Sequence, residues 1–179
     1  IISMTYFPGY GRATCIDFML NHAGVKYERK QLHPVSFYAG STKKTFGGLP
    51  FCQRSDGSFM QETVPIARYI ARIHGYWPSD PKEIFDNDYL VQLYQPVLNE
   101  MDANCFMFGA KKEQAKERRE VLFPKFFEKI SKYIKEGWAI GDGSKIYMAD
   151  FFLGTIYTDL IDSPSSWMSK EHEEYLRKQ

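Results

Sequence analysis

The sequence predicts an α/β part followed by an all-helical part, and three observations support this division. Short apolar segments with strand character occur only up to Gln61, and the first two of them are separated by a helical pattern. Beyond the Gly- and Pro-containing linker HGYWPSDPKE, strand signals almost vanish. We therefore expect a mixed four-stranded sheet with helices on its faces, in the order βαβαββα, and then a set of packed helices.

The first strand, helix and second strand are predicted from local patterns. Met4–Phe7 has strand character, and Pro8-Gly9 ends it. The next apolar residues repeat at the three- and four-residue spacing of one helical face: Ile16, Met19, Leu20 and Ala23. Gly24 then closes the helix. Lys26–Gln31 is expected to pair in parallel with the first strand, because a helix connects the two.

The stretch GGLPFCQRSDGSFMQETVPIARYIA predicts a hairpin that leads into a helix. Leu49–Cys52 is the first strand of the hairpin, Asp56-Gly57 is a signal for a two-residue turn, and Phe59–Gln61 returns as the second strand. The helical period follows at once, with Thr63 expected as the N-cap. Pro65 falls in the first turn, where its missing N–H does no harm.

Helical signals dominate the second part. Two long helices are predicted at Glu83–Phe108 and Lys111–Glu136, the second interrupted by Pro124. The run KKEQAKERRE interleaves both charges at helical spacings and is expected to be a solvated face. The segment after GDGSK is hydrophobic on all sides, which predicts a buried helix, and the polar tail is predicted to form a short last helix.

Composition and charge exclude several functional classes. A formal net charge of +1 provides no general field for nucleic acid or an anionic membrane. No segment approaches the roughly 20 apolar residues that cross a bilayer, and the strand-like start predicts no secretory leader. The cysteines are too few and too scattered for a disulfide framework or a zinc site: Cys15, Cys52 and Cys105. We expect no metal and a reducing, cytoplasmic location, which is rich in glutathione.

Taken in order and spacing, three motifs resemble the cytosolic glutathione S-transferases over nearly the whole chain. TYFPGYGRA is similar to the first strand and helix start of the tyrosine classes, most of all the sigma class. The segments LPF, DG and ETVPIARYIA are similar to the glutathione-binding part, and GDGSKIYMADF to the capping segment of the helical domain. The resemblance implies a thioredoxin-like glutathione-binding domain over residues 1–76, an all-helical domain over 83–179 that forms the electrophile site, and a homodimer.

The resemblance assigns the catalytic roles to Tyr6 and Arg12. In this family a tyrosine at the end of the first strand stabilises the glutathione thiolate, so Tyr6 is the predicted donor and Arg12 an electrostatic helper. A free thiol has a pKa of about 8.5, and lowering it by about two units needs roughly 2.7 kcal/mol of preferential stabilisation of the anion. A hydroxyl donor and a nearby cation can supply this in a dry cleft. Tyr10 is a rival donor, but the family varies at that point.

The resemblance also implies the residues that bind glutathione. At the start of the helix after the hairpin, free N–H groups and the helix dipole would hold a carboxylate at Thr63, while Glu62 would hold the adjacent ammonium of the γ-glutamyl end. Leu49, held by a cis Pro50, would offer its N–H and C=O to the peptide. The wall and the glycine end of the site complete the prediction: Phe7, Phe37 and Lys43.

The chain departs from the family pattern at several positions. Thr63 replaces a serine and Glu62 replaces the glutamine common in the sigma class, while Pro65 replaces an alanine. Tyr147 stands where a Ser or Thr would pair with Asp150, so only half of a capping box is expected. Only 29 residues follow Asp150, which predicts shortened final helices and an altered electrophile pocket.

The predicted function is conjugation of glutathione to hydrophobic electrophiles, as in detoxification. One alternative is isomerisation of a prostaglandin-type lipid with glutathione as cofactor. Another is a non-catalytic binding or structural relative, as in lens crystallins, which the short tail and the altered Glu62-Thr63 pair would favour. The sequence argues against a purely redox, glutaredoxin-like role because no Cys-x-x-Cys opens the first helix, and Cys15 and Cys52 are expected in the core.

Overall fold

The computed structural model describes residues 1–9, 11–33, 36–37, 48–106, 110–134, 137–156 and 158. The chain divides into two compact units, Ile1–Gly75 and Tyr76–Gln179. Across these described ranges, no helix combines the length and the apolar character that a membrane crossing requires. The expected last helix and most of the segment between the second strand and the hairpin lie outside the described residues.

The first unit contains a mixed four-stranded sheet with the strand order β2-β1-β3-β4. Strand β1 (Ser3–Tyr6) pairs in parallel with β2 (Glu28–Gln31) and antiparallel with β3 (Phe51–Gln53). Strand β4 (Phe59–Gln61) pairs antiparallel with β3. This arrangement confirms the predicted thioredoxin-like sheet, with β1 buried along its length as an inner strand.

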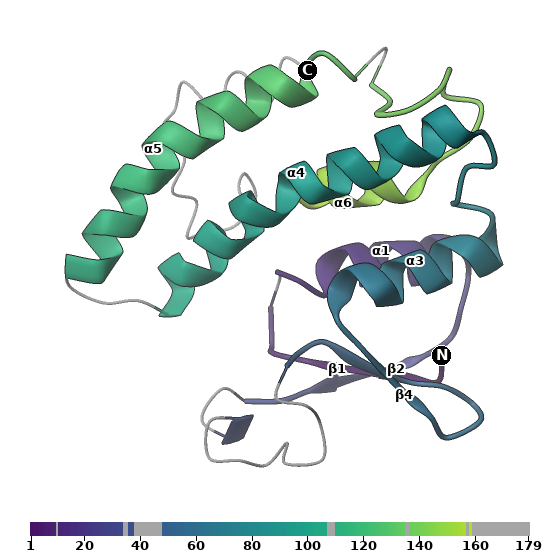
Figure 1. The fold of residues 1–179 in the computed structure, drawn as a ribbon. Helices are drawn as coiled ribbons and strands as arrows, with labels where there is room; N and C mark the ends of the chain where they lie inside the picture. Colours follow the sequence, from purple (N-terminus) through teal and green to yellow (C-terminus); the bar gives the residue numbers. More distant parts are fainter. Residues whose placement is uncertain are drawn as a thin grey trace. The chain divides into compact units, whose positions relative to one another are not determined.

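Two helices lie side by side on one face of this sheet, as Figure 1 shows. Helix α1 (Thr14–His22) buries the apolar face that its spacing predicts, and Gly24 follows it in the left-handed conformation with φ of 67°. Helix α3 (Thr63–His74) ends at Gly75, where φ is 81° and the N–H donates to the carbonyl of Ala71. A side chain would be strained at either glycine, which explains why both helices stop there.

The hairpin between β3 and β4 is longer than the two-residue turn that the sequence predicts. The Arg54 N–H donates to the Ser58 carbonyl (2.9 Å), and the Gly57 N–H donates to the Arg54 carbonyl (3.0 Å). A three-residue loop therefore separates the paired ends. Gly57 takes the left-handed position with φ of 83°, and the Asp56 carboxylate accepts the Ser58 N–H (2.9 Å). The prediction of a two-residue turn was therefore wrong. An Asp-Gly pair occurs in hairpin loops of either length, so it did not fix the length here.

The second unit is helical. Helix α4 (Pro81–Phe106) contacts both α5 (Ala110–Ile130) and α6 (Met148–Ile156). Both long helices contain an internal proline: Pro96 in α4 and the anticipated Pro124 in α5. The side chains described in the charged run are exposed, as predicted: Gln114, Glu117, Arg118 and Glu120.

The turn before α6 is closed by Asp150, which supplies the half of a capping box that the sequence predicts. Its carboxylate accepts the N–H of Tyr147 and the N–H of Ala139, each at 2.8 Å. Burial raises the pKa of Asp150 above its ordinary value, and the two N–H donors act in the opposite direction. Tyr147 provides no cap of its own, because its hydroxyl donates to Glu83 (3.2 Å).

The first N–H groups of α6 are satisfied by distant parts of the chain. The Met148 N–H donates to the carbonyl of Tyr76 (2.9 Å), and the Ala149 N–H donates to the side-chain oxygen of Asn87 (3.0 Å). Asn87 is completely buried on α4. These bonds attach the start of α6 to α4 and to the segment that precedes it.

Candidate functional site

The register of the sheet brings the predicted catalytic and binding segments to one end of it. Strands β1 and β3 are antiparallel with Thr5 opposite Phe51, so the next residue of β1, Tyr6, is level with Pro50. On the other side of β3, Phe51 lies opposite the last residue of β4, which directly precedes Glu62. Ligands in α/β folds commonly bind beyond the ends of such strands.

The hydroxyl of Tyr6 is held by the turn that precedes α1. Tyr6 is 4% exposed, and its oxygen accepts the main-chain N–H of Arg12 at 3.0 Å. Thr14 fixes this turn, because its hydroxyl accepts the Gly11 N–H (2.8 Å) and its own N–H donates to the Gly11 carbonyl (2.9 Å). Arg12 thus contacts the Tyr6 hydroxyl through its main-chain N–H. The sequence had instead suggested an electrostatic role for its guanidinium.

Gly11 leaves the space that the Tyr6 hydroxyl occupies. A Cβ at this position would lie 2.8 Å from the Tyr6 oxygen, and the backbone has φ of 129°. Both the close contact and the positive φ require glycine here. The pattern Gly-x-Gly around the turn is the signal that could have identified this residue from the sequence.

An ion pair lies next to Tyr6. The Nε of Arg29 is 2.9 and 3.1 Å from the two carboxylate oxygens of Asp17, which is on α1. The Tyr27 hydroxyl donates to the same carboxylate, and burial, followed by this bond, raises the pKa of Tyr27 far above its ordinary value. Both charged side chains are largely buried, with 24% of Arg29 and 20% of Asp17 exposed. No local pattern in the sequence links residues twelve positions apart on a helix and a strand.

The other end of the same guanidinium reaches Tyr6 and the chain that follows it. Its central carbon is 5.6 Å from the centroid of the Tyr6 ring. Its terminal nitrogens donate longer hydrogen bonds to the carbonyls of Phe7 (3.5 Å) and Gly9 (3.4 Å). Arg29 therefore contacts both the aromatic ring and the main chain that leads from it toward Arg12.

Phe7, the predicted wall of the site, lies next to Tyr6, and Phe37, predicted near the glycine end of glutathione, contacts Phe7. The Phe7 ring lies 5.5 Å from the Tyr6 ring and meets the edge of the Phe37 ring at 5.3 Å, between centroids. Phe7 and Phe37 are both half-buried. Lys43 and the rival donor Tyr10 lie outside the described residues.

The segment before β3 has the backbone form that the resemblance implies. The Leu49-Pro50 peptide bond is cis, as expected. Pro50 is buried and Leu49 is half-buried. The side chain of Gln61, the last residue of β4, donates to the carbonyl of Gly48 (3.4 Å), which joins this segment to the end of the hairpin.

Glu62 occupies an unusual position between β4 and α3. It is a non-glycine residue with φ of 69° and ψ of 123°, and its side chain is exposed. It takes the N-cap position without a side-chain cap bond, so the prediction that Thr63 is the N-cap was wrong. Thr63 is the first helical residue and is buried. Backbone strain of this kind costs on the order of 1 to 3 kcal/mol and concentrates at functional sites.

The start of α3 has the properties of an anion site. In a helix the first N–H groups have no partner within the helix, and the helix dipole makes this end positive. Pro65 has no N–H, so Thr63 and Val64 supply the donors of the first three helical positions. Glu62 adds a carboxylate beside them.

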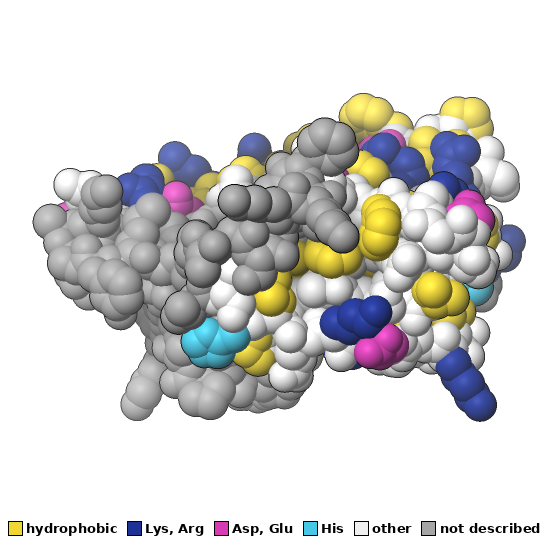
Figure 2. Space-filling model, turned by 90° about the horizontal axis from the view of Figure 1, so that it is seen from below, with side chains coloured by type: hydrophobic (Ala, Val, Ile, Leu, Met, Phe, Trp, Pro, Cys, Tyr) yellow, Lys and Arg dark blue, Asp and Glu magenta, His cyan; other side chains and the backbone are white. Residues whose placement is uncertain are grey.

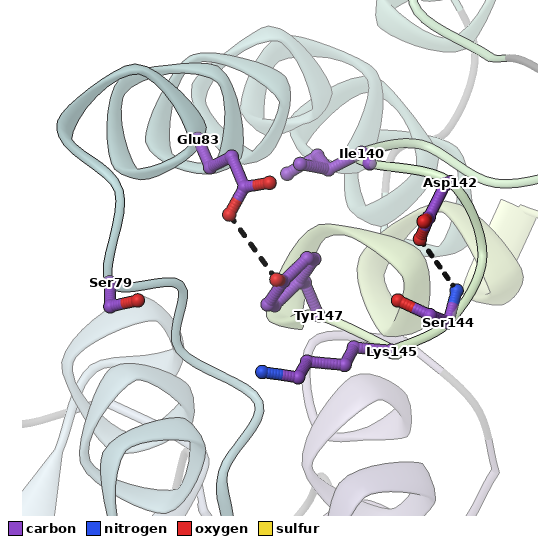
Figure 3. Close-up of a pocket in the computed structure, with 8 residues that line it drawn as sticks. Ser79, Glu83, Ile140, Asp142, Ser144, Lys145 and Tyr147 are labelled. Carbon is purple, nitrogen blue, oxygen red and sulfur yellow. Dashed lines mark hydrogen bonds between the residues drawn. The ribbon is translucent and has the colours of Figure 1, made fainter.

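A separate pocket of about 460 Å³ occurs within the helical unit (Figure 3). Figure 3 shows the Tyr147 hydroxyl bonded to Glu83 and the Asp142 carboxylate bonded to the N–H of Ser144. Lys145 adds an ammonium group to the same lining. None of the predicted glutathione-binding residues lines this pocket, and its charged walls do not fit the hydrophobic electrophile that the sequence suggests.

Figure 2 shows one face of the molecule, where the mixture of basic and acidic side chains agrees with the formal net charge of +1. Among the coloured atoms, basic and acidic side chains both occur, and hydrophobic side chains stand between polar and backbone atoms. No extended area of one charge covers the described part of this face.

No family model matches the chain, but comparisons with individual proteins find several that are similar in sequence. It is 26% identical to S-crystallin SL11 of Nototodarus sloanii over 78% of this chain and 71% of the relative. It is 25% identical to hematopoietic prostaglandin D synthase of Gallus gallus (88% and 78% covered). It is also 24% identical to the glutathione S-transferase class-mu 28 kDa isozyme of Schistosoma japonicum (97% and 87%).

A solved structure supports the same relationship. The chain superposes on monomeric Na-GST-3, a glutathione S-transferase from the hookworm Necator americanus, with a TM-score of 0.75. The two are 25% identical, and the match covers 99% of this chain and 91% of the other. The strand order and the helical second unit agree with this likeness: the chain has the glutathione S-transferase fold and is similar in sequence to proteins named as glutathione S-transferases.

Proposed function

We propose that the protein conjugates glutathione to electrophilic small molecules. The observation that carries this proposal is the buried Tyr6 hydroxyl, fixed by the Arg12 N–H at the end of the sheet where the cis Leu49-Pro50 bond and Glu62 also lie. In the reaction the glutathione sulfur attacks an electrophilic carbon and forms a carbon–sulfur bond. The leaving group departs with the electron pair of the bond that breaks.

Tyr6 lowers the pKa of the glutathione thiol in this mechanism. Its O–H donates a hydrogen bond to the sulfur, which favours the thiolate over the thiol. The Arg12 N–H bonded to the same oxygen offsets negative charge that develops on the tyrosine, so the hydroxyl becomes a stronger donor. The thiol proton leaves to solvent before the electrophile is attacked.

The binding roles follow the segments that meet around Tyr6. The N–H and C=O of Leu49 pair with the cysteinyl part of the tripeptide, as an added strand would. The start of α3 at Thr63 holds the γ-glutamyl carboxylate, and Glu62 holds its ammonium. The remaining residues line the aromatic wall and the glycine end: Phe7, Phe37 and Lys43. The helical unit supplies the site for the hydrophobic electrophile.

Calorimetric titration with glutathione, followed by turnover of a chloronitrobenzene over a range of pH, tests this function. We expect binding, and turnover that rises through an apparent pKa well below that of free glutathione. Tyr6→Phe should then lower kcat much more than the affinity for glutathione. Tyr69→Phe, on α3, is the matched control and should keep both values. An equal loss of kcat and affinity in Tyr6→Phe would argue against Tyr6 as the thiolate donor.

Two relatives support alternative functions for the same site. The similarity to a prostaglandin D synthase, with the sigma-like TYFPGYGRA motif, favours isomerisation of a lipid endoperoxide, again with glutathione as cofactor. The similarity to an S-crystallin favours a non-catalytic role. Glutathione binding without chloronitrobenzene turnover, together with turnover of a lipid endoperoxide, would select the isomerase. Absence of glutathione binding would select the structural role.

We further propose a cytoplasmic homodimer that acts in detoxification. Large hydrophobic side chains exposed on three elements offer candidate contacts for a second copy of the chain: Phe59 on β4, Phe85 on α4 and Val121 on α5. One relative of known structure is described as monomeric, so the assembly needs its own test. Sedimentation velocity should give a dimer for the native protein and a monomer for a variant with Phe59→Ser and Phe85→Ser. A monomeric native protein would refute this part.

A further inference from the structure

We propose that Arg29 is a positioning residue for Tyr6: its guanidinium, fixed by Asp17, sets how strongly the Tyr6 hydroxyl donates a hydrogen bond. This inference rests on the proposed function, in which that hydroxyl holds the glutathione sulfur. Neither Arg29 nor Asp17 belongs to the motifs that led to the site. The contacts of the guanidinium carry the argument.

The first step is that the guanidinium has a fixed position. Its Nε is shared between the two oxygens of Asp17 at 2.9 and 3.1 Å, and the Tyr27 hydroxyl restrains the same carboxylate. The Arg29 and Asp17 side chains are 24% and 20% exposed, so water screens this pair less than it screens a surface ion pair. A planar guanidinium held at Nε by Asp17 and at its two terminal nitrogens by main-chain carbonyls has little rotational freedom left.

The second step is that the fixed guanidinium acts on the Tyr6 ring. At 5.6 Å from the ring centroid the cation is within the range of a cation–π interaction. A cation stabilises a phenolate more than a phenol, because it also attracts the negative charge of the oxygen. Arg29 therefore draws electron density from the hydroxyl and strengthens the hydrogen bond that Tyr6 donates.

The third step is that Arg29 also restrains the main chain between Tyr6 and Arg12, whose N–H donates to the Tyr6 oxygen. The bonds from its terminal nitrogens to the carbonyls of Phe7 and Gly9 restrain the segment that leads to Arg12. The N–H of Arg12 in turn contacts the Tyr6 oxygen. One guanidinium thus restrains the segment that leads to the donor on this hydroxyl and supplies the charge beside its ring.

The charges around the ring set the expected direction. Asp17 opposes the field of Arg29 at the Tyr6 ring. Removal of the guanidinium deletes the cation and leaves the field of the Asp17 carboxylate unopposed, which disfavours the phenolate. For a unit charge at about 6 to 8 Å and an effective dielectric constant of about 40, the titration midpoint of Tyr6 should rise by about one pH unit.

The test is an NMR titration of protein labelled with ¹³C at the ζ carbon of tyrosine, whose chemical shift reports ionisation of the hydroxyl. Tyr6→Phe identifies the Tyr6 signal. Arg29→Gln keeps a donor for Asp17 but removes the charge, and we expect its Tyr6 midpoint about one pH unit above that of the native protein. Arg29→Lys keeps the charge and should shift the midpoint by less than half as much. Lys30→Met, next on the same strand and with an exposed side chain, should leave it unchanged.

The outcome that overturns the inference is a Tyr6 midpoint in Arg29→Gln equal to that in Lys30→Met. This readout needs no enzymatic activity, so it stands even if the native protein fails to bind glutathione and the proposed function is refuted. If the native protein is active, the rising limb of kcat/KM against pH should move upward by a similar amount in Arg29→Gln. The KM for glutathione should stay within about threefold. A change in KM alone would show a purely structural role and would also overturn the inference.

Discussion

Replacement of Gly11 by alanine tests the geometry around Tyr6 most directly. The new methyl carbon would lie 2.8 Å from the Tyr6 oxygen, a separation that packed carbon and oxygen atoms do not tolerate. Tyr6 is 4% exposed, so its ring has little space to retreat. The hydroxyl must move by about half an ångström or more, which weakens its bond to the Arg12 N–H.

The same loop contains the matched control. Gly9 also has a positive φ, 108° against 129° for Gly11, but a Cβ there meets no atom within 4 Å. Gly9→Ala and Gly11→Ala should each lose about 1 to 2 kcal/mol of folding free energy through backbone strain. Gly11→Ala should lose about 1 kcal/mol more, because the hydrogen bond to Tyr6 is disturbed. Only Gly11→Ala alters the position of the Tyr6 hydroxyl.

Urea unfolding and steady-state kinetics measure these two effects separately. The difference of about 1 kcal/mol in stability corresponds to about 2 to 4 °C in Tm for a chain of this size. We expect kcat to fall by about 10- to 100-fold in Gly11→Ala and by less than about threefold in Gly9→Ala. Equal stability and equal kcat in the two variants would refute the conclusion that Gly11 makes room for Tyr6.

Three further predictions concern other parts of the chain. Asp150→Ala should cost about 2 to 4 kcal/mol of unfolding free energy in urea, because two N–H groups lose their acceptor; a loss below about 1 kcal/mol would contradict this. Burial raises the pKa of Asp150 in the folded protein above its ordinary value. The contribution of this carboxyl group to stability is therefore full below the ordinary carboxyl pKa and declines as pH rises through the pKa in the folded protein. Asp150→Asn should remove this decline when the free energy of unfolding is measured against pH in the acid range. Burial raises the pKa of the Cys52 thiol to about 12, so iodoacetamide at pH 8 should modify Cys52 only after unfolding, as peptide mass spectrometry would show; rapid labelling of the native protein would be inconsistent with this.

Local patterns predicted most of the fold. The spacing of apolar residues identified α1, and the order of strands and helices gave the parallel pairing of β1 with β2. Phe59–Gln61 was predicted with the bounds that β4 has. These elements succeed because one periodicity or one turn residue decides each of them.

The errors arise where distant contacts decide the local form. Threonine is the better N-cap by intrinsic preference, yet Glu62 takes that position because the chain leaves β4 there with a positive φ. The Asp17 and Arg29 pair depends on α1 lying next to β2, which no pattern within either segment expresses. The predicted binding role of Lys43 stays a prediction, because this residue lies outside the described ranges.

The bonds at the start of α6 bear on the order in which the helical unit folds. An isolated nine-residue helix is unstable in water, and here the N–H of Ala149 depends on a side-chain oxygen 62 positions earlier in the chain. The first turn of α6 should therefore become stable only after α4 has formed and docked. Contacts of such long sequence separation slow folding, so formation of this junction is a candidate for the rate-limiting step of the unit. Asn87→Ala would then slow refolding more than it accelerates unfolding in a chevron measurement.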